Sequence, residues 1–112
     1  MSLVDEQSLF LKDICLLINH ANGLGFIVTG GELFRTPEQQ KLYVQTGRSQ
    51  TMNSYHLKRC AVDLNFFKDG QLCYDKTLLQ PVGDYWESLN GKNRWGGNWL
   101  SFRDIPHFER RV

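Results

Sequence analysis

The 112 residues of the chain are enough for one hydrophobic core but not for two of ordinary size, so we expect a single domain over residues 1–112. Hydrophobic residues make up 41% and charged residues 22%, which excludes an intrinsically disordered or collagen-like chain. The formal charge of +1 provides no global field that attracts nucleic acid or an anionic membrane. Any binding must therefore come from a local site, and we expect no nucleic-acid partner.

The first residues and the cysteines bear on where the protein is expected to reside. No apolar run approaches the ~20 residues that cross a bilayer, so no membrane insertion is expected. The opening sequence MSLVDEQ carries acids where a signal peptide would be basic, which predicts synthesis in the cytoplasm. The three cysteines cannot all pair within one chain and show no CxxC spacing, so we expect no disulfide framework.

The first half of the chain predicts two helices and one strand. Apolar residues repeat at helical spacing over residues 9–21, and an Asn-Gly pair follows where a C-cap would lie. The glycine-bounded run 25–30 is typical of a short buried strand. Thr36 as N-cap, followed directly by proline, predicts a helix over residues 37–46. The polar, aperiodic stretch 48–55 is expected to be a loop.

The second half predicts a hairpin and a further helix. Polar and apolar residues alternate over the strand 60–67, so Asp63 points away from the core side. An Asp-Gly turn leads into a short second arm at residues 72–74. A helix is expected at 81–89, ended by an Asn-Gly pair. The following stretch, 95–99, is too rich in glycine for a helix.

Two short stretches hold most of the candidate metal ligands. One runs from Ser54 and His56 to Asp63, and the other contains Asp104 and His107. A catalytic zinc takes three nitrogen or oxygen ligands and leaves one position for water, and two histidines with one aspartate meet that count. A further carboxylate must stay off the metal to accept a proton from the water. Asp104, three residues before His107 across a stiffening proline, suits this role.

The same residue types also have structural explanations. A single histidine in a small domain is more often hydrogen-bonded or exposed than a ligand, Asp63 suits the open face of a strand, and Asp104 suits a turn. Cys60 follows His56 by four residues, but it alternates out of phase with Asp63, so we expect a small buried hydrophobe there. Arg35 precedes a helix N-cap, where a cation opposes the helix dipole, which hints at a functional reason.

Taken together, these stretches resemble the zinc peptidases of the M15 group, which includes D-alanyl-D-alanine carboxypeptidases and phage L-alanyl-D-glutamate endopeptidases. The group's pattern S-x-H-x-x-G-x-A-x-D-L is met by residues 54–64, except that Arg59 replaces the glycine. Its second pattern, W-G-G-x-W followed by F-x-D-x-P-H-F-E, is met by residues 95–109. An arginine followed by a helix with paired glutamines is also typical of the group, and here these residues are Arg35, Gln39 and Gln40.

The resemblance implies an α+β fold, similar to D-Ala-D-Ala peptidases and the hedgehog domain, in which a small antiparallel sheet has helices packed on one face. It implies Zn²⁺ bound by His56, Asp63 and His107. It also implies that Asp104 is the general acid/base and that Arg35 stabilises the oxyanion. The substrate contacts expected beside the metal are Ser54, Gln39 and Trp99.

These expectations predict a zinc metallopeptidase acting on the stem peptide of peptidoglycan. A phage or prophage endolysin that cuts the L-Ala-D-Glu bond fits best, acting as a monomer at the bacterial cell wall after release. A D-alanyl-D-alanine carboxypeptidase is the alternative, because the two activities share these motifs. A catalytically silent, zinc-stabilised binding module, as in the hedgehog signalling domain, is a third hypothesis, although a structural zinc needs neither Asp104 nor Arg35.

Overall fold

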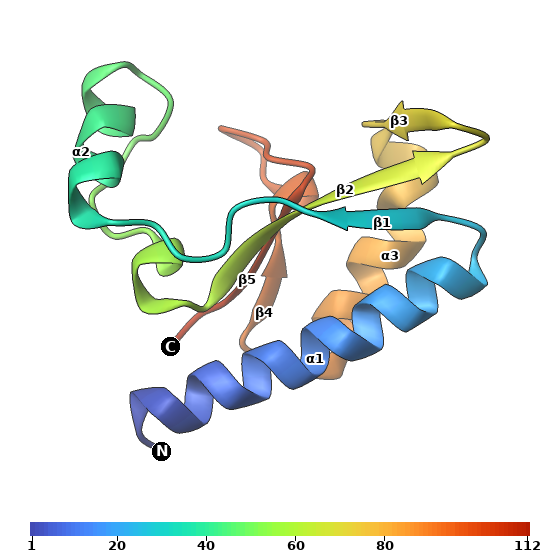
Figure 1. Cartoon of the computed structure of the whole chain (residues 1–112), viewed down its shortest axis with the longest axis horizontal. Helices are drawn as coiled ribbons and strands as arrows, with labels where there is room; N and C mark the ends of the chain where they lie inside the picture. The colour runs from blue at the N-terminus through green and yellow to red at the C-terminus, as the bar shows by residue number, and fades with distance from the viewer.

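The computed structural model describes all of residues 1–112 and combines three α-helices with a five-stranded sheet. The elements in chain order are α1 (Leu3–Gly23), β1 (Ile27–Gly30), α2 (Pro37–Gln45), the 3-10 helix η1 (Tyr55–Lys58), β2 (Ala61–Lys68), β3 (Gln71–Cys73), α3 (Lys76–Leu89), β4 (Asn93–Trp95), the 3-10 helix η2 (Gly96–Asn98) and β5 (His107–Arg110) (Figure 1). None of the helices combines the length and the apolar character needed to cross a membrane.

The sheet is antiparallel throughout and is built around β2. The strand order is β1-β2-β5-β4, and β3 pairs with β2 as the second arm of the predicted hairpin. The first half of β2 pairs with β5, and its second half pairs with β1 and β3. The structure therefore confirms the α+β class and the small antiparallel sheet, and it makes β2 the strand that joins the two parts of the sheet.

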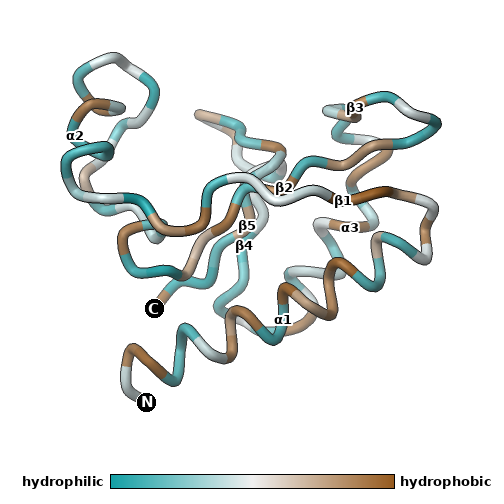
Figure 2. The backbone as a smooth tube through the Cα atoms, viewed as in Figure 1, coloured by the Kyte–Doolittle hydropathy of each residue, from teal (hydrophilic) through white to brown (hydrophobic).

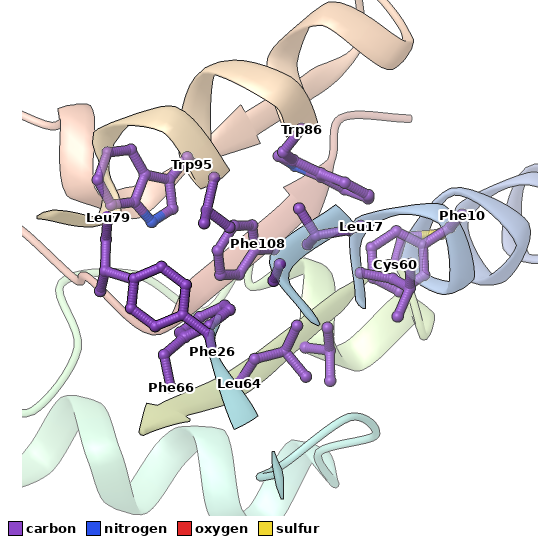
Figure 3. Close-up of a cluster of buried hydrophobic side chains, with 14 residues drawn as sticks. Phe10, Leu17, Phe26, Cys60, Leu64, Phe66, Leu79, Trp86, Trp95 and Phe108 are labelled. Carbon is purple, nitrogen blue, oxygen red and sulfur yellow. The ribbon is translucent and has the colours of Figure 1, made fainter. Parts of the chain in front are cut away.

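The hydrophobic core lies between the sheet and two helices, α1 and α3. One stripe of α1 and one face of α3 are buried against β2 and β5, and hydrophobic residues recur at intervals along α1 (Figure 2). Figure 3 shows Trp86, Trp95 and Phe108 in this cluster. Each such side chain stabilises the fold by about 1.5–3 kcal/mol on burial. Figure 1 shows α2 apart from these two helices, so the packed layer on one face consists of α1 and α3.

Two helices begin earlier than the hydrophobic pattern predicts. α1 begins well before residue 9, because Ser2 and Asp5 form a capping box at its start. α3 begins before Pro81, because the Asp75 carboxylate accepts backbone hydrogen bonds from the first turn. Pro81 therefore lies inside the helix rather than at its first position. In both cases a local cap, and not the apolar period, sets the boundary.

Trp95, at the end of β4, is fully buried, and two glycines make room for its indole ring. A Cβ atom on Gly83 would lie 2.0 Å from the ring, and one on Gly97 would lie 2.2 Å from it. The indole N–H donates a hydrogen bond to the carbonyl oxygen of Ile105 at 2.7 Å.

The glycine-rich stretch 95–99 contains one short turn of 3-10 helix, η2. The expectation that this stretch holds no helix was therefore wrong for that turn.

This packing predicts the effect of an alanine at Gly83. Alanine favours an exposed helix by about 1 kcal/mol over glycine. Here, however, Gly83→Ala should lower the free energy of unfolding by about 1–3 kcal/mol, because the new methyl group overlaps the Trp95 ring. Urea unfolding measures the change. Gly91→Ala is the control, since its added Cβ meets nothing within 4 Å. A Gly83→Ala protein as stable as the parent would contradict this account.

Candidate metal centre

Three side chains from different elements meet at one end of β2. The antiparallel register places Asp63 of β2 directly opposite His107 of β5. His56 lies in η1, where the Ser54 hydroxyl accepts a hydrogen bond from its backbone N–H at 3.2 Å. One donor atom from each of the three residues lies within 4.8 Å of the others. The three ligands that the resemblance implies are therefore brought together by the fold.

Hydrogen bonds determine which ring nitrogen of each histidine faces the other donors. His56 Nδ1 lies 2.9 Å from the carbonyl oxygen of Leu33, so it carries the hydrogen and leaves Nε2 with a lone pair. His107 Nε2 lies 2.7 Å from the Glu109 carboxylate, which leaves Nδ1 facing Asp63. Both imidazoles are therefore held in the orientation that a metal ligand requires.

The unpaired atoms and their spacing fit a zinc ion. His56 Nε2 and Asp63 Oδ1 are buried without a hydrogen-bond partner, which is unusual for polar atoms inside a protein. Asp63 Oδ1 lies 3.4 Å from His56 Nε2 and 3.5 Å from His107 Nδ1. Ligands about 2.0–2.1 Å from a tetrahedral zinc lie about 3.3 Å from one another. The donor types and these two distances match that ion.

Asp63 and His107 influence each other's protonation. Burial disfavours the charged form of His107, but the neighbouring carboxylates of Asp63 and Glu109 outweigh it and raise the pKa of His107 to about 9. Burial likewise disfavours the carboxylate of Asp63, but the adjacent imidazoles of His107 and His56 lower its pKa well below the ordinary value. Asp63 is thus ionised at neutral pH, and a metal ion must displace a proton from His107.

Asp104 lies beside the three donors without joining them. Its Oδ2 atom is 3.9 Å from His107 Nδ1, and partial burial raises the pKa of its carboxyl group. The backbone N–H of Asp104 donates to the carbonyl oxygen of Gly96 at 3.0 Å. A Cβ atom on Gly96 would lie 2.2 Å from the Asp104 carbonyl oxygen. Gly96 therefore allows the close backbone approach that positions this carboxylate.

Arg35 is held at the cleft by several contacts. Its guanidinium forms an ion pair with Glu32 and donates to the Gln40 side-chain oxygen at 2.7 Å. Gln40 is fully buried, and its amide nitrogen donates to the hydroxyl of Ser49 and to the carbonyl oxygen of Thr51. Gln40 thus ties Arg35 to the loop that follows α2. The guanidinium is fixed before any substrate arrives.

A cleft of about 800 Å³ contains most of the predicted site. The predicted residues that line it are Arg35, Ser54, His56, Asp63, Trp99, Asp104 and His107. The Trp99 ring lies against His107, with ring centroids 5.1 Å apart. Gln39 does not line the cleft, and the glutamine that contacts Arg35 is its neighbour Gln40.

Two positions in the first motif are explained by the backbone. Arg59 adopts a left-handed conformation with φ of 54°, which glycine adopts at the least cost, so the structure accounts for the glycine in the pattern. Its guanidinium lies over the Phe34 ring, 4.2 Å from the centroid. Cys60 is fully buried in the core, as predicted, and does not line the cleft.

Sequence reasoning assigned no role to several residues that hold the site together. These residues are Glu32, Gln40, Glu109 and Arg111. Glu109 belongs to the second motif and follows His107 by two residues in a strand, so both project from one face. That spacing could have identified Glu109 as a neighbour of His107 from the sequence alone. The contact between Glu32 and Arg35 depends on the conformation of a loop, which no repeating pattern in the sequence predicts.

Comparisons with known proteins show which proteins the chain is similar to. The model of an M15 peptidase family, described as D-alanyl-D-alanine carboxypeptidase, matches residues 47–110. An L-alanyl-D-glutamate peptidase from Listeria phage A118 is 34% identical over 92 residues, which cover 81% of this chain but only 32% of that protein. The crystal structure of the Serratia marcescens L-Ala D-Glu endopeptidase ChiX is similar with a TM-score of 0.71 at 25% identity, covering 90% of this chain and 77% of that chain.

The raised pKa of His107 predicts how metal binding depends on pH. Because His107 is protonated below about pH 9, zinc and a proton compete for its Nδ1 atom. The apparent zinc affinity should therefore rise by nearly tenfold for each pH unit from pH 7 and by slightly less as pH 8.5 is approached, because one proton is displaced. Competition with a chelator of known affinity at each pH measures this. A zinc affinity that does not change over that range would contradict the account.

Proposed function

The chain belongs to the M15 peptidase family, and from this premise we propose that it is a zinc-dependent peptidase that cleaves the L-Ala-D-Glu bond in the stem peptide of peptidoglycan. The observation that carries the proposal is the His56, Asp63 and His107 donor set with the non-coordinating carboxylate of Asp104 in the same cleft. The choice of bond is supported by the names of the Listeria phage and Serratia proteins.

Three atoms would hold the zinc, namely Nε2 of His56, Oδ1 of Asp63 and Nδ1 of His107. A zinc bound there would polarise the substrate carbonyl and lower the pKa of a water molecule toward ~7. Three protein ligands leave one coordination position open, which is typical of catalytic zinc sites, whereas structural sites use four protein ligands. The donor count therefore favours catalysis over a purely structural metal.

Asp104 is proposed as the general base and then the general acid. Its carboxylate accepts a proton from the attacking water as the water oxygen bonds to the peptide carbonyl carbon. When the C–N bond breaks, Asp104 returns that proton to the leaving amine. A carboxyl group with a raised pKa holds the transferred proton better than an ordinary aspartate does, which suits both steps.

Arg35 is proposed to stabilise the negative charge that develops on the carbonyl oxygen. Its guanidinium is already oriented by Glu32 and Gln40, so it needs little reorganisation when that charge forms. The Nη1 atom of Arg35 also lies 3.5 Å from the hydroxyl of Ser54, which lines the cleft and is proposed to contact the substrate. Losing one preorganised donor of this kind typically lowers turnover ~10²–10³-fold.

Two arginines of the cleft are suited to an acidic substrate. Arg48 and Arg103 line the cleft, and neither forms an ion pair within the chain. The Arg48 guanidinium lies over the Tyr43 ring, 4.6 Å from its centroid, which leaves its outer edge available. The stem peptide of peptidoglycan carries free carboxylates, for which guanidinium groups are suitable partners.

Because the proposed substrate is peptidoglycan, we infer that the protein acts on the bacterial cell wall after its release from the cell.

A D-alanyl-D-alanine carboxypeptidase is the second candidate, because the matching family model carries that description. Digestion of purified peptidoglycan, with and without a chelator, followed by mass spectrometry of the fragments, separates the two activities. The proposal predicts new peptides with N-terminal D-Glu, which the chelator abolishes. Released D-Ala without those peptides would instead identify a carboxypeptidase. No chelator-sensitive product would contradict both activities and favour a binding module.

Substitutions at Asp104 and His56 test the proposed division of roles. Asp104→Asn should retain zinc but lower kcat ~10²–10⁴-fold, because an amide cannot accept the proton. His56→Ala should lose both zinc and activity, since it removes a ligand. Metal content of the purified variants and their rates on peptidoglycan measure the two effects. Normal turnover by Asp104→Asn would overturn its role.

A further inference from the structure

The two histidines of the site are supported by different partners. His56 bonds to a neutral backbone carbonyl, whereas His107 bonds to the carboxylate of Glu109. Glu109 is only 5% exposed, and its second oxygen, Oε2, accepts a hydrogen bond from Arg111 Nε at 2.8 Å. Arg111 is half exposed and lines the cleft. A chain of contacts therefore runs from the cleft surface through Glu109 to the metal-facing ring.

The sheet leaves room for this buried carboxylate. Ala61 of β2 lies directly opposite Glu109 in the register with β5, and it is fully buried. Its methyl group occupies little of the space that a larger cross-strand neighbour would fill. The Trp86 indole N–H donates to the Glu109 carbonyl oxygen at 3.2 Å, which fixes the backbone beneath the carboxylate. Both strands thus accommodate Glu109 next to His107.

We propose that Glu109, oriented by Arg111, is a positioning residue that keeps His107 in the tautomer presenting Nδ1 to zinc and thereby strengthens zinc binding. This inference rests on the zinc site of the proposed function. Without an acceptor at Nε2, the hydrogen can move to Nδ1, or the ring can turn over, and either change places the wrong atom toward Asp63. A carboxylate acceptor also makes the imidazole a better donor to the metal.

Zinc affinity measured by chelator competition tests the proposal without reference to peptidase activity. Glu109→Ala should raise the zinc dissociation constant ~10–100-fold. Glu109→Gln keeps the shape and an acceptor oxygen but loses the charge, so its effect should be smaller. Arg111→Gln should also weaken binding, but less than Glu109→Ala, because Glu109 remains. Glu38→Gln, which removes an exposed carboxylate on α2, is the matched control and should leave the dissociation constant unchanged.

Each variant is checked for folding by circular dichroism, and zinc binding is measured well below its melting temperature. Folded Glu109→Ala with unchanged zinc affinity would overturn the proposal, as would an equal loss in the Glu38→Gln control. If Glu109→Ala does not fold, the zinc affinities of Arg111→Gln and of the isosteric variant Glu109→Gln test the proposal instead. The proposal would be overturned if both variants bound zinc as tightly as the parent protein. If the parent binds zinc but releases no peptide from peptidoglycan, the proposed function fails while this inference stands.

Discussion

The antiparallel pairing of β2 with β5 is the constraint on which the rest of the site depends. It places Asp63 opposite His107 and brings one oxygen of Asp63 within 3.5 Å of the facing ring nitrogen. The core fixes this register, because Val62 and Leu64 are buried on the opposite face of β2. A slip of one residue would turn Asp63 into the core and Val62 toward the cleft, which the hydrophobic effect opposes. Packing therefore enforces the ligand geometry.

The remaining functional groups are fixed by segments outside these two strands. Asp104 depends on Gly96, since its missing side chain allows two backbone segments to approach. Arg35 depends on a fully buried glutamine that connects it to the loop after α2. The proposed metal ligands are thus held mainly by the sheet, and the groups proposed for proton transfer and charge stabilisation are held by loops. Loops tolerate sequence variation better than strands, which suits a family whose members differ in the bond they cleave.

The sequence predicted the parts of the structure that follow from short periods and local motifs. Alternation along β2 correctly placed Asp63 away from the core, and Thr36 with Pro37 correctly marked the start of α2. The N-caps of α1 and α3 were missed because no apolar pattern begins at them, so the predicted starts of both helices were wrong. The paired glutamines could not be distinguished, because adjacent helix residues face directions about 100° apart and only the tertiary structure shows which of them meets Arg35. Roles of individual side chains in substrate binding stay predictions.

The central claim is that His56 Nε2, Asp63 Oδ1 and His107 Nδ1 together bind one catalytic zinc ion. A crystal structure of the purified protein, with anomalous diffraction recorded on both sides of the zinc absorption edge, tests it most directly. The account predicts a single anomalous peak within bonding distance, about 2.0–2.2 Å, of those three atoms. No zinc peak at the site after growth with zinc, or a peak bound through Nε2 of His107 instead of Nδ1, would contradict it.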